Sequence, residues 1–560
     1  MKAKYLFLAI SFSLVSSCNY LDFDETSGLR TKEDIYRYFD NTKSMLTHIY
    51  SYMPQDFGSL DGAMRDCASD DAEYAYIGAA VQDFNNGNWS SLNTHDNAWG
   101  LYNAIRAANG FLVEIENVDF SDYQYNGSYK QWMDQLKYFP YEARVLRAFY
   151  FFELARRYGD IAMPLTVLGM DEANTVTKTK FDDVIEFITN ECDACAPELP
   201  ETYHNVLGSE TGRVTKGFAM ALKSKALLYA SSKLHNPSMD KKKWERSAKA
   251  ALDLINTELY QLDKDAVVNN NVSKELVLCR MNGDDFSFEL NNFPIRFTEG
   301  RRGFLTSSTF PSENLASAFE TINGYSVTLT STGYESADPQ FDPLHPYKNR
   351  DPRMARTLIA DGDEFKGETI ELFTGGKDDL ERSAGGSVTG YFLKKYIQEE
   401  ANFVRDNEVM KKHHWVIYRY AETLLTYAES MVEAFDDPGY TDGTYKYSAL
   451  WAINQVRSNA GMPAIQPCGK EEFLIKLRNE WRVEFAFEDH RFWDIRRWKM
   501  GPETQKELYG VSITKNESGT KSYKKVIYES RFWNDRMYLY PISKSELYKN
   551  TNLLPQNPGW

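Results

Sequence analysis

Residues 473–500 read FLIKLRNEWRVEFAFEDHRFWDIRRWKM, a stretch in which charged and aromatic side chains are closely interleaved. Phe473, Leu477, Trp481 and Phe485 recur at steps of four residues, which is the spacing of one face of an α-helix. The pattern therefore predicts an amphipathic helix that buries this apolar face against other parts of the chain.

The same stretch holds groups that could suggest acid–base chemistry, among them Glu488, His490 and Asp494. Aromatic residues flank these charges, however, and neither a nucleophile nor a metal-ligand spacing accompanies His490. Charged groups stay buried in proteins only when they are paired. We therefore expect Arg482, Glu484 and their charged neighbours to form structural ion pairs.

The bulk composition is that of a large globular protein. The chain has 560 residues, of which 42% are apolar and 26% are charged. Its net charge of −16 disfavours nucleic acid as a partner, because that binding depends on Lys and Arg neutralising phosphates. Aromatic residues make up 14% of the chain, which is enough for both a core and a binding surface.

No motif in the sequence marks a cofactor or a catalytic centre. Cys192 and Cys195 have the CxxC spacing of redox and zinc sites, but no second CxxC completes four ligands, so we expect inert buried thiols. His413 and His414 are adjacent and therefore point apart. The GxSxG, HExxH and glycine-rich phosphate motifs are absent. We predict no cofactor, with a structural calcium ion left open although nothing in the sequence indicates one.

The N-terminus has the parts of a secretory signal. Two lysines precede an apolar run over residues 5–15, and two serines lead into Cys18. The run is too short to span a bilayer, which takes about 20 residues. A cysteine at this place resembles a bacterial lipobox, so we expect residues 1–17 to be a lipoprotein signal peptide and Cys18 to be lipidated. Residues 18–30 would then form an acidic tether.

Helical periodicity recurs along most of the chain. The segments expected to be helical are 31–52, 99–118, 141–158, 181–196, 213–235, 241–257, 417–436 and 446–460. Residues 54–95 interrupt this pattern and indicate a long loop excursion of functional interest. Residues 262–415 lose the helical period, which predicts an irregular subdomain. The chain is therefore expected to be mainly α, with helical parts over 31–261 and 416–560.

Several of these stretches resemble the RagB/SusD family, the surface glycan-binding lipoproteins of Bacteroidetes. Residues 478–498 follow the family's C-terminal signature, with Trp481 and Asp489 as departures that leave the spacing unchanged. Residues 141–165, YEARVLRAFYFFELARRYGDIAMPL, keep nearly all of a second signature, and further landmarks follow in the family's order. The resemblance covers the whole chain. It implies a SusD-like fold, in which tetratricopeptide-like helical hairpins form a scaffold for the irregular subdomain.

The resemblance also implies a function. SusD-like proteins are not enzymes but lipid-anchored proteins of the outer membrane, exposed on the cell surface. They capture an oligosaccharide or polysaccharide and deliver it to a SusC-like TonB-dependent transporter. The residues leave two other functions open, a lipid-anchored glycoside hydrolase or esterase that uses two carboxylates, and a scaffold that holds only proteins.

A carbohydrate site needs aromatic rings that cover the C–H face of a pyranose and polar groups that bond its hydroxyls. The excursion over 54–95 contains both kinds. The expected rings are Tyr74, Tyr76, Phe84 and Trp89, and the expected polar partners are Arg65, Asp71 and Asn93. In SusD-like proteins the irregular subdomain lies beside such loops, so by region the resemblance adds Phe304, Tyr325 and Tyr334.

Overall fold

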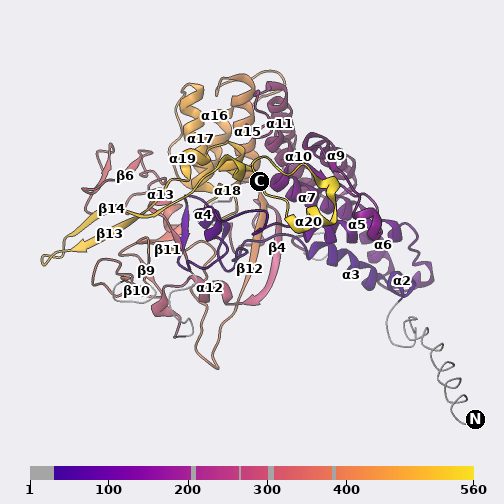
Figure 1. The fold of residues 1–560 in the computed structure, drawn as a ribbon, viewed down its shortest axis with the longest axis horizontal. Helices are drawn as coiled ribbons and strands as arrows, with labels where there is room; N and C mark the ends of the chain where they lie inside the picture. The colour runs from indigo at the N-terminus through magenta and orange to yellow at the C-terminus, as the bar shows by residue number, and fades with distance from the viewer. Residues whose placement is uncertain (1–30, 204–209, 264–266, 301–307, 381–385) are drawn as a thin grey trace, which may run out of the picture.

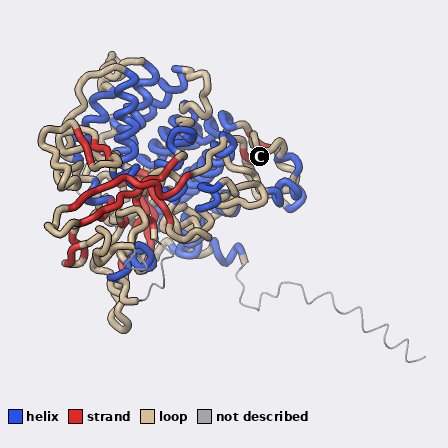
Figure 2. The backbone as a smooth tube through the Cα atoms, turned by 60° about the vertical axis from the view of Figure 1, so that its left-hand side comes forward, coloured by secondary structure: helices blue, strands red, loops and turns tan. Residues whose placement is uncertain are grey.

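The computed structural model of the chain describes residues 31–203, 210–263, 267–300, 308–380 and 386–560. The expected signal peptide, Cys18 and the tether lie outside the described residues, and so does Phe304. The helices form a curved body, and most of the strands gather on one side of it (Figures 1 and 2). Within the described ranges, no helix has the length and apolar character needed to cross a membrane.

The N-terminal part is helical, and local signals mark the ends of its helices. A capping box of Thr31 and Asp34 begins α2, and Gly159, with φ of 70°, ends α7 in a backbone conformation that favours glycine. The pattern predicted over 31–52 is divided into two helices, α2 and α3. The helices of this part are α2 (Lys32–Tyr36), α3 (Phe39–Tyr50), α4 (Gln82–Asn86), α5 (Leu101–Ile115), α6 (Tyr129–Leu136), α7 (Phe139–Tyr158), α8 (Met170–Ala173), α9 (Phe181–Cys195), α10 (Lys216–Ser231) and α11 (Lys241–Ile255).

The helices of the C-terminal part continue the same body. They are α15 (Tyr420–Phe435), α16 (Ala449–Ala460), α17 (Lys470–Glu484), α18 (Arg491–Arg497), α19 (Gly501–Thr504) and α20 (Lys544–Lys549). Neighbours pack in a row, α5 on α7, α7 on α9, α9 on α10, α10 on α11, α11 on α15 and α15 on α16. In α11, Trp244, Ala248, Ala251 and Ile255 form one buried face, as an amphipathic helix requires. The packing confirms the prediction of a mainly α fold built from helical hairpins.

The region over 262–415 carries short helices and two-stranded antiparallel pairs. Its helices are α12 (Ser287–Asn292), α13 (Glu313–Ala316) and α14 (Met354–Thr357). Its strands are β4 (Leu276–Asp285), β5 (Thr309–Pro311), β6 (Val327–Leu329), β7 (Tyr334–Ser336), β8 (Leu358–Ile359), β9 (Glu364–Phe365), β10 (Glu368–Thr369), β11 (Phe392–Leu393) and β12 (Lys411–Arg419). The longest pair joins β4 to β12. β6 pairs with β7, β8 with β11 and β9 with β10, whereas β5 pairs with a strand outside this region. β12 continues to Arg419, so the predicted helix over 417–436 begins three residues too early.

A β-hairpin near the C-terminus is absent from our prediction of a helical C-terminal part. β13 (Glu507–Lys515) pairs with β14 (Lys521–Ser530) in an antiparallel ladder. In β13 the side chains of Leu508, Val511 and Ile513 are buried. The turn between the strands contains Gly519 at φ of 86°, where glycine is favoured. Alternating apolar residues around a glycine turn are the sequence signal that would have predicted this hairpin.

The excursion over 54–95 is not an exposed loop, which corrects our expectation. It contains strand β1 (Ala72–Tyr74), which pairs with β5, and the helix α4. Residues 63–74 are buried without a break. The segment therefore crosses the interior between the helical scaffold and the irregular subdomain, and only its outer turns reach the surface. Two further short strands, β2 (Ile161–Ala162) and β3 (Lys178–Thr179), pair with each other beside α7.

Candidate functional site

Most of the residues that we predicted to bind carbohydrate lie in the interior. Arg65, Asp71, Tyr74 and Trp89 are at most 4% exposed, so a ligand in solvent cannot reach their side chains. The same holds for the predicted ring of Phe84 and for Tyr334, which was added by region. These predictions were wrong because a ring in a glycine-rich and asparagine-rich stretch can pack against distant segments as readily as it can face solvent.

Trp89 shows what replaces the expected sugar contact. Its ring packs between Phe84, Tyr540 and Trp560, at centroid distances of 4.5, 4.7 and 5.0 Å. Two of these partners come from the C-terminal segment, more than 400 residues later in the sequence. Trp89 therefore fixes the C-terminus to the excursion.

The buried polar groups of the excursion pair with the signature stretch, residues 473–500. Arg491 binds Asp70 through two bonds of 2.8 and 2.9 Å, and the Arg482 Nε donates to Asp71 at 2.6 Å. Burial alone would raise the pKa of Asp70, but the guanidinium groups of Arg482 and Arg491 lower it to about 2. Asp70 is thus held ionised, whereas burial raises the pKa of Asp71 in spite of Arg482. Both carboxylates serve as partners of arginine in the interior.

Arg65 belongs to a second group of ion pairs. It bonds Asp96 at 2.9 and 3.0 Å and also pairs with Asp489 of the signature stretch. Arg157 of α7 bonds the same Asp96, and Arg156 bonds Asp489. The excursion, α7 and the signature stretch therefore meet in one network, and the role of Arg65 is structural.

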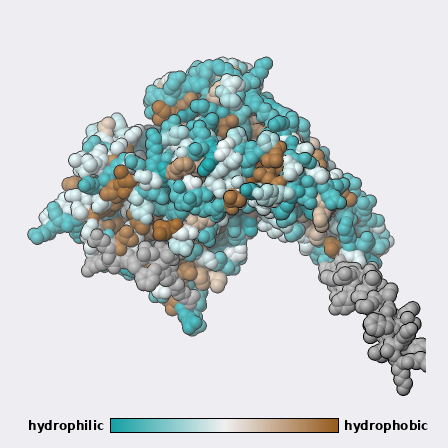
Figure 3. Space-filling model, viewed as in Figure 1, coloured by the Kyte–Doolittle hydropathy of each residue, from teal (hydrophilic) through white to brown (hydrophobic). Residues whose placement is uncertain are grey.

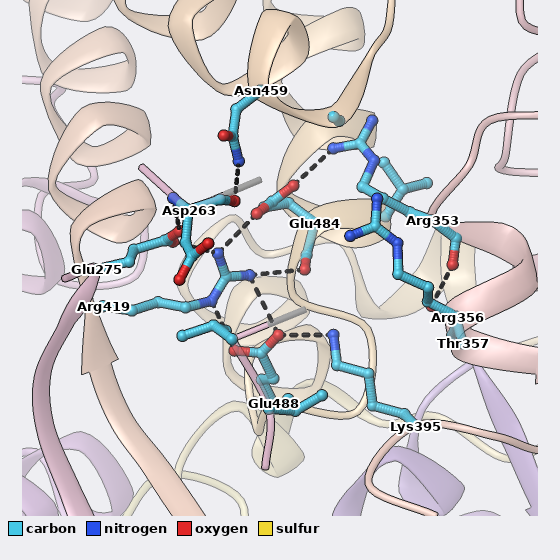
Figure 4. A pocket seen from close by; sticks show the side chains of 14 residues that line it. Asp263, Glu275, Arg353, Arg356, Thr357, Lys395, Arg419, Asn459, Glu484 and Glu488 are labelled. Carbon is cyan, nitrogen blue, oxygen red and sulfur yellow. Dashed lines mark hydrogen bonds and ion pairs between the residues drawn. The ribbon is translucent and has the colours of Figure 1, made fainter. Parts of the chain in front are cut away.

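Figure 4 shows the pocket beside α17, where the carboxylates of Glu484 and Glu488 face Arg419. The distances from Arg419 are 2.6 Å to Glu484 and 2.8 Å to Glu488, and Arg353 and Lys395 bond the two glutamates from the other side at 2.7 Å each. The cavity measures about 60 Å³, which is too small for a sugar ring.

The carboxylates in this pocket are also the candidates for the catalytic pair of a hydrolase. A general acid needs a carboxyl group whose pKa is raised towards neutrality. Burial favours such a rise for Glu484, but Arg419 and Arg353 lower its pKa to about 2, and Arg419 and Lys395 likewise lower the pKa of Glu488. His490 and Asp494 are similarly buried beside Glu422 and Arg497. The geometry is that of structural ion pairs, as predicted.

The thiols and histidines give no sign of a metal centre. Cys192 and Cys195 are buried and free, and burial raises the pKa of both thiols, which agrees with the prediction of inert groups. His413 bonds Glu289 and His414 faces the Val267 carbonyl oxygen, so the two rings serve different partners. Among the described residues, no cluster of three or more His, Cys, Asp or Glu side chains could hold a metal ion.

Three predicted site residues do reach the surface. Tyr76 is 45% and Tyr325 43% exposed, and Asn93 is exposed as well. Tyr76 follows β1 directly, and its ring lies over Gly78, where a Cβ atom would come within 2.9 Å of it. Ile77, beside it, is 86% exposed. The turn over 76–78 therefore presents an aromatic ring to solvent.

The other two exposed residues belong to separate surfaces. The Asn93 amide donates to Asp83 at 2.7 Å, and His95 bonds the same carboxylate. Tyr325 ends a turn whose Gly324 lies against Pro463, next to an open groove along α17. The hydrophobic residues on the face in Figure 3 are likewise scattered in small patches. The structure thus does not bring the predicted rings together on one surface.

Comparison with known proteins agrees with the fold. The model of the SusD family matches residues 285–560. A SusD-like protein P2 from Formosa agariphila is 26% identical over 435 residues, which cover 75% of this chain and 73% of that protein. The crystal structure of a SusD-like protein from Bacteroides fragilis superposes with a TM-score of 0.77 and 26% identity, covering 96% of this chain and all of that one. The part of the chain over 285–560 belongs to the SusD family.

A second solved SusD-like structure shares the fold. A SusD-like carbohydrate binding protein from Bacteroides fragilis has a TM-score of 0.74 and 23% identity, and the match covers 93% of this chain and all of that one. Together these comparisons confirm the resemblance recognised from residues 141–165 and 478–498. They also confirm the SusD-like fold class, with its row of helical hairpins beside an irregular region.

Replacing Glu484 by Gln should lower the free energy of unfolding by about 3–5 kcal/mol at pH 7, because Arg353 and Arg419 lose a buried partner. The pKa of Glu484 is lower in the folded than in the unfolded state, so its contribution is present above about pH 4.5 and is lost as the pH falls towards 2. The variant should therefore lose part of the acid dependence of stability in denaturant titrations. Glu517→Gln, in the exposed hairpin turn, is the matched control. Equal stability of the two variants would contradict the ion-pair assignment.

Replacing Trp89 by Ala should cost about 3–5 kcal/mol of stability, because it leaves a cavity between Phe84 and Tyr540. Denaturant unfolding measures this loss, with Leu92→Ala, 78% exposed in the same segment, as the control. The affinity of the folded Trp89 variant for carbohydrate should stay that of the native protein. If the Trp89→Ala variant has native stability but a weakened affinity for carbohydrate, Trp89 belongs to the binding site after all.

Proposed function

We propose that this protein binds an oligosaccharide or polysaccharide at the cell surface, with Tyr76 as an aromatic platform of the site. The observation that carries the proposal is the solvent-facing ring of Tyr76, which lies over Gly78, in a chain that matches the SusD family. The similarity to a solved SusD-like carbohydrate binding protein supports it. A tyrosine ring held over a glycine can stack on a pyranose without first paying the entropy cost of ordering.

The binding protein would hand its ligand to a transporter. The family relationship favours a SusC-like TonB-dependent transporter in the outer membrane as the partner. The row of packed helices from α5 to α16 supplies a rigid body for such a complex. A stable interface of this kind buries more than about 1,000 Å². We expect the transporter to co-purify with the protein from detergent-solubilised outer membranes.

Lipidation of Cys18 would hold the protein on the outer membrane, on the outside of the cell. Replacing Cys18 by Ser should prevent acylation and release the protein from the membrane fraction, because acyl chains supply the anchoring energy. Metabolic labelling with a fatty acid and cell fractionation measure the two effects. Ser17→Ala, beside the cysteine, serves as the control. Membrane retention of the unlabelled Cys18 variant would contradict a lipid anchor.

Replacing Tyr76 by Ala should weaken carbohydrate binding by about 1–3 kcal/mol, by analogy with stacking of bases on aromatic rings. Tyr76→Phe should keep most of the affinity, since the ring face remains. Calorimetry against soluble neutral and acidic polysaccharides measures the change, with Tyr125→Ala, at a 94% exposed ring elsewhere, as the control. Unchanged affinity in Tyr76→Ala would remove this residue from the site.

The same panel separates binding from the alternatives. Incubation with each polysaccharide should release no new reducing ends or acyl groups. Turnover that one carboxylate substitution abolishes would establish a hydrolase or esterase instead. A protein that gives no heat with any glycan yet co-purifies with the transporter would be a scaffold only.

A further inference from the structure

The C-terminal segment with α20 lies beside the N-terminal helices (Figure 1). Residues of both parts line a further cavity. Its floor is the first half of α5. One wall is the segment over 162–176, and the other is α20 with the residues that follow it. The cavity measures about 250 Å³ and opens to solvent. It shares no lining residue with the turn over 76–78.

The walls of this cleft are held in place by hydrogen bonds of their own. The Asn109 amide donates to the carbonyl oxygens of Pro164 and Thr166 at 3.0 Å each, and the Tyr102 hydroxyl donates to the Ala162 oxygen at 3.1 Å. On the other side, Asn550 donates to the Val176 oxygen at 2.8 Å. The cleft is therefore formed before any ligand arrives, as small-molecule sites usually are.

Two aromatic rings form a corner in the cleft. The rings of Trp99 and Tyr102 are both half-buried, with centroids 5.1 Å apart and planes inclined at 65°. In this edge-to-face arrangement the edge of one ring meets one face of the other, and Trp99 packs in the same way on Tyr158. Both rings nevertheless line the cavity. Leu168, Val176 and Leu553 add apolar walls. The corner thus offers ring faces to an apolar surface of a ligand.

Polar groups stand on the same face of α5. Asn103 and Arg106 are three residues apart in α5, so their side chains lie on one side of the helix, and Trp99 lines the same cavity from the turn before α5. Arg106 donates one bond to the Leu168 oxygen at 2.6 Å, and this fixes its guanidinium at the rim. Asn103 is exposed, and within the described part of the chain its amide bonds no other group. Amide and guanidinium groups are suited to bond hydroxyl groups.

We infer that this cleft is a second carbohydrate site that takes a single pyranose ring, stacked in the corner of Trp99 and Tyr102. Asn103 and Arg106 would bond its hydroxyls. The inference rests on the proposed carbohydrate function, which it extends to a cavity that Tyr76 does not line. A cleft of this volume admits one sugar ring of a longer chain, so a bound polysaccharide would contact the protein at two places. Such a second contact raises avidity without changing the first site.

Saturation-transfer-difference NMR with the methyl glycosides of glucose, galactose, mannose and xylose tests the cleft in the full chain. At least one glycoside should give a signal, and the double variant Asn103→Ala, Arg106→Gln should bind it roughly tenfold more weakly, because two hydrogen bonds are lost. Trp99→Phe, which keeps a ring, should weaken it less than Trp99→Ala does. Tyr125→Ala, at an exposed ring outside the cleft, should leave the glycoside signal unchanged.

Each negative result has one meaning. The inference is overturned if none of the glycosides binds, or if the double variant binds as tightly as the native protein. In either case polysaccharide binding that depends on Tyr76 would leave the proposed function standing. A native protein that binds glycosides in the cleft but no polysaccharide would contradict the proposed function alone. Thermal unfolding of the double variant, whose substitutions are on exposed side chains, should match that of the native protein and so excludes a folding defect.

Discussion

A buried carboxylate needs a cationic partner, and in this protein that requirement joins the excursion near the N-terminus to the signature stretch near the C-terminus. Asp70 and Asp71 lie in the interior, where ionised groups are stable only when they are paired and hydrogen-bonded. Their partners, Arg482 and Arg491, are more than 400 residues away in the sequence. The excursion over 54–95 can therefore take its place only when the signature stretch is folded against it.

The same cross-links explain where binding chemistry can and cannot lie. They hold β1 in the interior, so Tyr74 is buried, whereas Tyr76, just past the end of the strand, projects at the surface. The carboxylates that could have suggested catalysis are occupied by arginine and lysine. The groups that remain free to bind a ligand lie at two places. One is the turn over 76–78, which the ion pairs position, and the other is the cleft between α5 and the C-terminal segment. A preorganised surface of this kind loses little entropy when a ligand binds.

The helices could be predicted because periodicity is a local property, and α5, α7, α9 and α16 fall where it places them. The signature stretch could also be interpreted correctly, since closely spaced charges among aromatics imply pairing. The site could not be predicted to the same degree. The sequence around Trp89 does not indicate that its ring packs against Tyr540 and Trp560. The sequence around Arg65 likewise does not indicate its ion pair with Asp489. Composition identified rings and polar groups but gave no information on which of them long-range partners would bury. Trp99 and Tyr102 fell within the predicted helix over 99–118, and nothing in that prediction indicated that they would line a cleft with Asn103 and Arg106.

Hydrogen exchange followed by mass spectrometry tests the central dependence most directly, by comparing the native protein with Arg482→Gln. Our account predicts faster exchange in a peptide over residues 70–80, because Asp71 loses its buried partner there, while α9 and α10 keep their protection. Unchanged protection over 70–80 in a variant that has lost this guanidinium would show that the excursion is held by other contacts. That result would contradict the claim that the ion pairs position the surface at Tyr76.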